Sequence, residues 1–408
     1  MHPDKKKKLL LCWWYDRPDL FAHFLALTDT FEITVIFYRF REQEELTAAI
    51  PCKRLYWTDH PSPYHILDQV QPDIVGFMGV EDALTLGLLL AARHRSLRTY
   101  YIAHGITLSY RSLLAAYDQV QKELLPERYD VENPVYHKNK SHSLKFLMRA
   151  IRPGNLHVVP YLLRFLLAAR KYSKVCERLY HAPSPIRMPD RYIVFSMRFG
   201  RMLAERDRVP AQWFVEAGPY TLDGLFQSFL DGEQVAAPDG LQDYLLLIDQ
   251  PIVQVTHAGK VAFYQKLAQA AAAVDRLLVV KLHPTDYERP GLPDDPNIRY
   301  VRATGNMAAL IMHADGCYGF YSTLLLPTVY YKKCVLFRIG DDELTREWGD
   351  MGLVKVLDFH DFKPADAGFD MQPIPESVRE AYLKSYIISA DGQSVQRLRQ
   401  ALLDNVPS

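Results

Sequence analysis

Polar residues follow two apolar runs in the second half of the sequence. The first run contains Lys281 and ends at His283-Pro284, and the second is followed by Ser322 and Thr323. Each run has the composition of a buried strand, so the polar groups would lie at the carboxyl edge of a parallel sheet, where α/β folds bind ligands. Hydroxyl groups and the free N–H groups at a helix start bind phosphate. We therefore expect an anion site at His283, Ser322 and Thr323, with Lys281 available to neutralise the charge.

These residues also have structural interpretations that the sequence leaves open. Ser322 would act as the N-cap of a helix over 322–332, His283 would be hydrogen-bonded within the fold, and Lys281 would be a solvated strand residue. Two polar groups at matching strand ends of one sheet favour the shared anion site.

The first half contains a further apolar run that ends in a histidine, at His104-Gly105. Imidazole titrates near neutral pH, so this side chain can take a proton from an acceptor hydroxyl. His104 is the candidate general base, with Gly105 as a structural turn, and a hydrogen bond to a nearby carbonyl is its structural alternative. Glu81 and Asp82, after another apolar run, are the competing base, and a helix-capping role explains that pair at least as well.

Two motifs of nucleotide-dependent enzymes are missing from the chain. It contains no Asp-x-Asp, the metal-binding motif of many sugar-nucleotide enzymes with a single Rossmann domain. It also lacks Gly-x-Gly-x-x-Gly after the first apolar run, which disfavours a dinucleotide-dependent oxidoreductase. We therefore expect no metal and no cofactor, and a leaving group stabilised by protein donors.

Apolar runs alternate with helical patterns twice along the 408 residues, which predicts two α/β domains with doubly wound parallel sheets. The first domain is expected over residues 1–230, the second over 231–372, and closing helices over 373–408. Gly218 and Asp223 provide turn residues before the boundary. The strands of the first domain are expected near 9–14, 33–38, 52–57, 73–78, 99–103, 192–196 and 213–217, and those of the second near 244–249, 277–282, 298–301, 315–319 and 333–337.

Charge and composition limit which partners and which cellular compartment are expected for the protein. The chain carries 48 basic and 48 acidic side chains, so it lacks the cationic excess that nucleic-acid binding would need. Its five cysteines are scattered and include no Cys-x-x-Cys pair, as expected of reduced residues in a cytosolic protein. No apolar run reaches the length of about eighteen residues that a membrane span needs. We expect a cytoplasmic protein, either soluble or peripheral on the inner face of the cytoplasmic membrane.

A basic insert, expected to be helical over about 106–185, interrupts the first domain. From His137 to Lys174 it contains nine Lys or Arg and no acidic residue, interleaved with apolar clusters. Anionic lipid headgroups attract such segments. The cations expected to contact a membrane or a lipid-linked acceptor are Lys138, Lys140, Lys145, Arg149 and Arg152. The alternative is a solvated helical face whose apolar side packs on the first domain.

The order of these motifs resembles bacterial GT-B enzymes of surface polysaccharide synthesis, namely sialyl- and polysialyltransferases and the CDP-glycerol glycerophosphotransferases of teichoic acid assembly. In such sialyltransferases a His-Pro pair contacts the donor phosphate or cytidine and a Ser-Ser or Ser-Thr pair binds the phosphate, as His283-Pro284 and Ser322-Thr323 would here. The base of those enzymes belongs to an acidic pair followed by Gly, whereas Ala follows the acidic pair of this chain. His104 with its glycine is more similar to the glycerophosphotransferases, in which a His-Gly carries the base role.

The resemblance implies an α/β fold of the GT-B type, with two Rossmann-like domains facing across a cleft and the basic insert in the first. It implies an inverting, metal-independent glycosyltransferase that takes a sugar from a nucleotide donor, cytidine-activated (CMP- or CDP-linked) by preference. The acceptor would be a hydroxyl of a bacterial envelope glycan or lipid-linked glycan. Transfer of a polyol phosphate is the alternative in chemistry. A sugar-nucleotide 2-epimerase, which would need carboxylates such as Glu81, Asp82 and Asp223, and a non-catalytic binding subunit are the alternatives of other classes.

Overall fold

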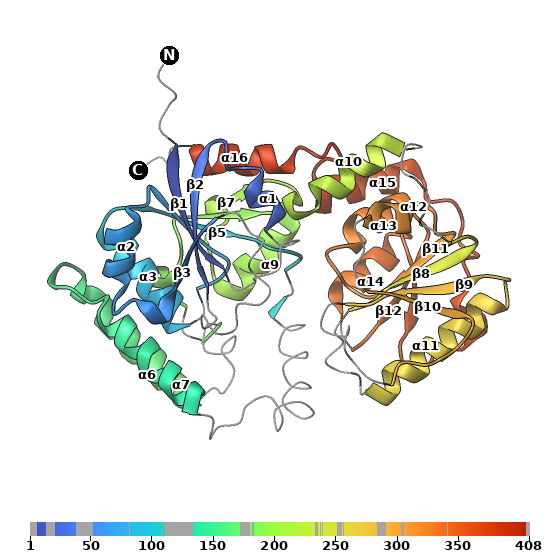
Figure 1. Cartoon of the computed structure of the whole chain (residues 1–408), viewed down its shortest axis with the longest axis horizontal. Helices are drawn as coiled ribbons and strands as arrows, with labels where there is room; N and C mark the ends of the chain where they lie inside the picture. The colour runs from blue at the N-terminus through green and yellow to red at the C-terminus, as the bar shows by residue number, and fades with distance from the viewer. Residues whose placement is uncertain are drawn as a thin grey trace, which may run out of the picture. The chain divides into compact units, whose positions relative to one another are not determined.

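The polypeptide forms two compact α/β units. The first comprises the described residues up to Tyr110, from Pro134 to Thr221 and from Gln393 on, and the second those from Leu222 to Gly392. Each unit contains one parallel sheet (Figure 1). The computed structural model describes residues 6–13, 21–37, 52–80, 82–107, 109–110, 134–171, 180–181, 183–232, 236, 238, 240–250, 255, 257–283, 291–302, 306–340 and 342–404.

Seven parallel strands form the sheet of the first unit, in the order β3-β2-β1-β4-β5-β6-β7. Their bounds are β1 Lys7–Trp13, β2 Phe31–Phe37, β3 Lys53–Tyr56, β4 Ile74–Phe77, β5 Arg98–Ile102, β6 Arg191–Val194 and β7 Phe214–Glu216. The apolar residues of β1 are buried on both faces, as helices on both sides of a central parallel strand require. Gly76 of β4 lies so close to its neighbours that a Cβ there would be 2.8 Å from side-chain atoms of Leu11 and Ile102.

The first unit also contains helices, and the last helix of the chain returns to this unit. Their bounds are α1 Ala22–Leu25, α2 Pro63–Val70, α3 Ala83–His94, α6 Pro134–Met148, α7 Val159–Lys171, α9 Met197–Asp207 and α16 Ser394–Leu403. Of these helices, α6 packs on α3. Arg397 of α16 donates to the carbonyl of Ala217 at 3.2 Å, and Arg98 of β5 donates to that of Asp404 at 3.2 Å. Of the residues expected to form closing helices over 373–408, those up to Gly392 belong to the second unit and those from Gln393 on, with α16, to the first.

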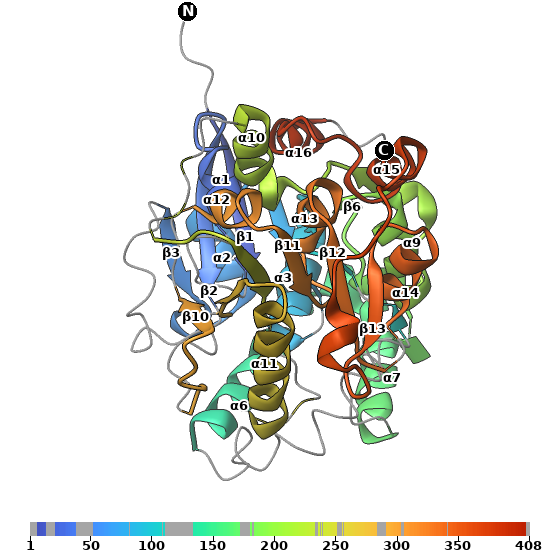
Figure 2. The same ribbon diagram turned by 90° about the vertical axis from the view of Figure 1, so that its right-hand side faces the viewer.

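The second unit contains six parallel strands in the order β10-β9-β8-β11-β12-β13. Its elements are β8 Tyr244–Ile248, β9 Leu277–Lys281, β10 Ile298–Val301, β11 Gly316–Gly319, β12 Cys334–Arg338 and β13 Lys355–Asp358, with α10 Asp223–Asp231, α11 His257–Ala272, α12 Met307–Met312, α13 Leu325–Tyr331, α14 Glu343–Asp350 and α15 Glu376–Tyr382. The helices α11 and α13 cover opposite faces of the sheet (Figures 1 and 2). Phe263 of α11 lies within 6 Å of the rings of Phe320, Phe337 and Phe359 and anchors the core on its face.

Two expectations about local structure need correction, and two elements were not predicted. The helix expected over 322–332 begins at Leu325. Asp223, expected in a turn, opens α10 and belongs to the second unit, where an acidic side chain in the first turn of a helix is favourable. The strand β13 and the helix α14 were not predicted. For β13 the reason is that it is half-buried along its whole length and carries no apolar run. Among the described residues no helix is long and apolar enough to cross a membrane.

Candidate active site

Three loops leave the second sheet at the same level of its carboxyl edge. Ile248, the last residue of β8, is the register partner of both Lys281 in β9 and Gly319 in β11. The strand order reverses between β8 and β11, because β8 continues towards β9 on one side and β11 towards β12 on the other. Ligands of doubly wound sheets bind at such a switch point. The residues that follow β8, β9 and β11 are therefore the candidate ligand-binding groups.

The loop after β11 carries Ser322 and Thr323, both half-buried. Their carbonyl oxygens accept hydrogen bonds from the N–H groups of Leu325 and Leu326 at 2.9 and 3.1 Å. The N-cap position of α13 is Leu324, without a side-chain cap, so the structural role expected of Ser322 as an N-cap is wrong. The two residues lie in the turn before the helix, beside the switch point.

The end of β9 carries the other predicted anion ligands. Lys281 is half-buried, and its Nζ donates to the carbonyl of Leu282 at 2.8 Å. His283 is half-buried two residues beyond the strand, and Pro284 lies outside the described residues. Because β9 and β11 both pair with β8, His283 and Ser322 follow strands on either side of the same central strand. The topology thus brings the predicted anion ligands to one edge of one sheet.

A buried ion pair at this edge was not predicted. Asp249 directly follows β8, and its Oδ2 accepts a hydrogen bond from Nζ of Lys260 in α11 at 2.8 Å. The two side chains are 0% and 4% exposed. Burying two charges is costly unless the pair is well hydrogen-bonded, and Lys260 also donates to the carbonyl of Gln250 at 3.2 Å. The only sequence signal is an aspartate at the end of an apolar run.

The loop after β11 also presents a phenol. Burial, and to a smaller extent the Asp342 carboxylate, raise the pKa of Tyr321 to about 12. Asp342 itself caps α14, accepting hydrogen bonds from the N–H groups of Leu344 and Thr345 at 3.1 and 3.3 Å. Tyr321 therefore remains a hydrogen-bond donor throughout the physiological pH range.

His104 lies at the corresponding edge of the first unit, two residues after β5. Its ring meets the indole of Trp13 edge-on, with centroids 6.4 Å apart. Burial, reinforced by the Arg206 guanidinium, lowers the pKa of His104 to about 4. The imidazole is therefore neutral at physiological pH, which is the form that accepts a proton. Gly105 follows at a buried bend, in line with the expected turn.

Of Glu81 and Asp82, the acidic pair that competes with His104 for the role of base, the structure describes only Asp82. Glu81 lies outside the described residues. Asp82 is the N-cap of α3, where its Oδ1 accepts a hydrogen bond from the N–H of Thr85 at 2.9 Å. The hydroxyl oxygen of Thr85 in turn accepts a hydrogen bond from the N–H of Asp82. This reciprocal arrangement is a capping box. The capping interpretation of Asp82 is thus the one seen in the structure.

The remaining predicted residues are dispersed. Gly218 adopts a left-handed φ of +79°, and a Cβ there would lie 2.5 Å from Oγ of Ser394, so the turn requires glycine. Lys138 and Lys140 belong to α6, but their side chains are outside the described part. The other three cations of the basic insert are exposed: Lys145, Arg149 and Arg152.

Comparison with known proteins reveals similarity of fold. No protein-family model and no curated protein sequence matches the chain. A putative UDP-N-acetylglucosamine 2-epimerase from Listeria monocytogenes is 12% identical over 97% of this chain and 96% of its own, with a TM-score of 0.53. The UDP-GlcNAc 2-epimerase from Neisseria meningitidis, bound to UDP-GlcNAc, is 14% identical over 98% and 100%, with a TM-score of 0.51. The wall teichoic acid polymerase TagF is 10% identical over 98% and 89%, with a TM-score of 0.48.

At these identities the likeness to the two epimerases extends to the fold alone. It covers almost the whole of each chain, so both α/β units take part in it. The expected architecture of two Rossmann-like domains of the GT-B type is confirmed by this likeness and by the two parallel sheets.

Proposed function

We propose that the chain is a glycosyltransferase that moves a sugar from a nucleotide-activated donor to a hydroxyl of a bacterial envelope glycan. The observation that carries the proposal is the arrangement at the switch point of the second sheet. There, His283 follows β9 and Ser322 and Thr323 follow β11, on the two sides of β8. An imidazole, two hydroxyls and a nearby lysine are the donors that a nucleotide phosphate needs.

These groups have the following roles in the proposed transfer step. His104 takes the proton of the acceptor hydroxyl while the acceptor oxygen forms its bond to the anomeric carbon. The bond from that carbon to the donor phosphate breaks, and the phosphate leaves with the electron pair. Because the acceptor attacks the face opposite the phosphate in one displacement, the configuration is inverted. His283, Ser322 and Thr323 stabilise the charge that develops on the phosphate. Lys281 contributes only if its amino group exchanges the carbonyl of Leu282 for the phosphate.

The donor nucleotide is proposed to be CMP- or CDP-linked, on the motif resemblance, and to require no divalent metal, because the sequence has no Asp-x-Asp. Transfer of a polyol phosphate would use the same anion site with attack at phosphorus. An epimerase would need carboxylates at the sugar. Of the two described candidates for that role, Asp82 caps α3 and Asp223 lies in the first turn of α10, so each has a structural explanation within its own unit.

Ligand-induced stabilisation tests the donor site. We expect CMP or CDP, in the presence of a metal chelator, to raise the melting temperature of the second unit. A ligand at about a hundredfold excess over its Kd stabilises by about 2.7 kcal/mol. His283→Ala and the Ser322→Ala/Thr323→Ala pair should reduce this response, whereas the exposed Ser385→Ala is the matched control. A response that is complete in the site variants, or that needs magnesium or manganese, would contradict the proposed site.

Product analysis then separates the reactions. Release of free nucleotide together with a glycosylated acceptor supports glycosyl transfer. A phosphate retained in the product indicates polyol-phosphate transfer, and an isomerised sugar nucleotide without acceptor indicates an epimerase. Binding without turnover over a panel of donors and acceptors would indicate a binding subunit.

A further inference from the structure

Exposed apolar side chains are concentrated on one part of the first unit. Of the seven large apolar side chains that are conspicuously exposed in the described part of the chain, two are in the second unit, Leu230 and Val274. The other five lie on α6, on α7 or in the turn between them, and they are 46–61% exposed: Leu144, Met148, Leu156, Leu163 and Leu167. We call these five residues the outer face.

The core does not account for the outer face, because the same helices use other residues to pack inward. Helix α6 packs against α3 (Figure 1). Phe146 and Leu147 of α6 are buried there, and a Cβ on Gly87 of α3 would lie 3.2 Å from both residues. Leu162 of α7 is also buried in this cluster, next in sequence to the exposed Leu163. The two helices therefore have more apolar surface than the first unit covers.

Cations are interleaved with the outer face. Leu144 and Met148 are four residues apart on α6, and Lys145 and Arg149 form the adjacent row. Arg164 lies beside Leu163 on α7, and all these cations are exposed. No acidic residue occurs between residues 137 and 174. The segment itself therefore contributes only positive charge beside the outer face.

Two of the cations are held in place by the fold. Arg149 donates to the carbonyl of Pro61 at 2.7 Å, and the guanidinium of Arg152 lies 4.8 Å from the ring centroid of Tyr64. These contacts fix the turn between the helices and leave both side chains exposed. The turn between α6 and α7 is thus anchored to the segment that carries Pro61 and Tyr64.

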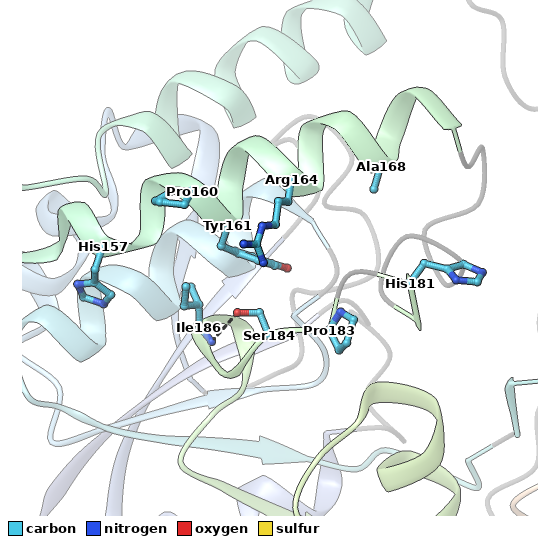
Figure 3. A pocket seen from close by; sticks show the side chains of 9 residues that line it. All are labelled: His157, Pro160, Tyr161, Arg164, Ala168, His181, Pro183, Ser184 and Ile186. Carbon is cyan, nitrogen blue, oxygen red and sulfur yellow. Dashed lines mark hydrogen bonds between the residues drawn. The ribbon is translucent and has the colours of Figure 1, made fainter.

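A cavity of about 510 Å³ opens next to the outer face. Figure 3 shows the Arg164 side chain extending from α7 towards the segment that carries Pro183 and Ser184. His157 and His181 also line the cavity, and its described lining includes no carboxylate. A phosphate group close to Leu163 would therefore find a cation and hydrogen-bond donors beside it.

We propose that the outer face binds the surface of an anionic lipid bilayer. Leucine and methionine side chains enter the boundary between headgroups and acyl chains, while Lys and Arg reach the phosphates with their long stems alongside. A polyanion such as a nucleic acid matches the charge but leaves the five apolar side chains in water. A protein partner would have to be acidic and apolar along the same stripe. The bilayer satisfies both properties at once, and this surface is independent of the reaction proposed above.

Vesicle flotation of the whole chain tests the proposal. We expect co-flotation with vesicles of equal parts phosphatidylglycerol and phosphatidylcholine, weaker flotation with phosphatidylcholine alone, and loss at high salt. Each cation near such a surface contributes roughly a fivefold change in partition, so Lys145→Gln/Arg164→Gln should lower it about 25-fold. Leu163→Ser/Leu167→Ser should lower it at least about tenfold, because the apolar insertion is lost.

Matched variants elsewhere control for charge and apolarity. Leu230→Ser/Val274→Ser removes equally exposed apolar side chains, and Lys53→Gln/Lys384→Gln removes two exposed cations. Both control variants should float like the wild type. The proposal is overturned if the wild type does not float with the anionic vesicles at low salt. It is also overturned if the outer-face variants and the control variants partition equally.

Discussion

His23 provides a test of why the first unit should lose stability as the pH falls. Its side chain is 4% exposed in α1, and neither ring nitrogen has a hydrogen-bond partner among the described residues. The rings of Phe24 and Tyr220 surround it, with centroids 4.0 and 5.3 Å away. Burial, and then the neighbouring His104, lower the pKa of His23 to about 3, and the pKa of His104 itself is lowered to about 4.

The direction of the pH effect follows from these two values. Both folded-state pKa values lie below the ordinary 6.5, so at intermediate pH the unfolded chain binds protons that the folded chain does not. The stability of the first unit is therefore complete above about pH 6.5 and is lost as the pH falls towards the folded-state values. Between about pH 7 and about pH 5 each histidine accounts for a loss of about 2 kcal/mol, or about 4 kcal/mol for the pair.

Replacing His23 by leucine should remove half of this loss. The side chains are similar in volume, and the variant no longer buries an imidazole without partners, a cost of about 1–3 kcal/mol. We expect His23→Leu to be at least as stable as the wild type at about pH 7 and to lose only about 2 kcal/mol by about pH 5. Urea unfolding at the two pH values, followed by hydrogen exchange in peptides from β1 and β2, reports on the first unit.

His94→Leu is the matched control for this measurement, because that ring lies on α3 of the same unit and is already exposed. It should leave the pH dependence unchanged. An unaltered acid response in His23→Leu would refute the reasoning. So would a destabilisation of more than about 2 kcal/mol at neutral pH, because such a loss would mean that the imidazole makes a hydrogen bond of that order.

Three further substitutions test the site and its support. His104→Ala should lower turnover by about a hundredfold or more while nucleotide-induced stabilisation persists, and full turnover would exclude it as the base. Asp249→Asn should destabilise the second unit by about 3–5 kcal/mol in thermal melts because it leaves the buried Lys260 uncompensated, whereas Asp249→Leu/Lys260→Met should cost less. Gly316→Ala would place a Cβ 2.5 Å from the ring of Phe369, so hydrogen exchange of β11 should reveal a loss of about 1–3 kcal/mol.

The strands were predictable because central parallel strands are apolar on both faces. The strands β1 and β9 are examples, since each contains an uninterrupted apolar run, residues 9–13 and 277–280, that stands out without any knowledge of its neighbours. The edge strand β13 has no such run and was missed. The carboxyl-edge positions of His104, His283 and Ser322 followed directly from the strands that precede them.

What the sequence could not supply was the pairing of distant residues. Asp249 follows β8 and its partner Lys260 lies on α11, and a lysine on an otherwise ordinary helix has the pattern of a surface residue. His23 reaches His104 from α1, which is distant in the chain. The helical tail had the correct periodicity, yet periodicity identifies only a buried face, such as that of Leu398 in α16, and does not specify which unit buries it.

The basic insert also shows that a helical pattern does not specify which of its apolar residues are buried. A helix with one apolar stripe has an unambiguous inward face, but α7 carries leucines on adjacent rows, so the sequence supported core packing and membrane contact equally well. The structure assigns Leu162 to the core and leaves Leu163 and Leu167 outside it. Single exposed leucines are ordinary on protein surfaces, whereas several gathered on one short stretch are typical of an interaction surface. The leucines that the first unit leaves exposed, together with the basic residues beside them, are the reason for proposing an anionic surface as the partner of these helices.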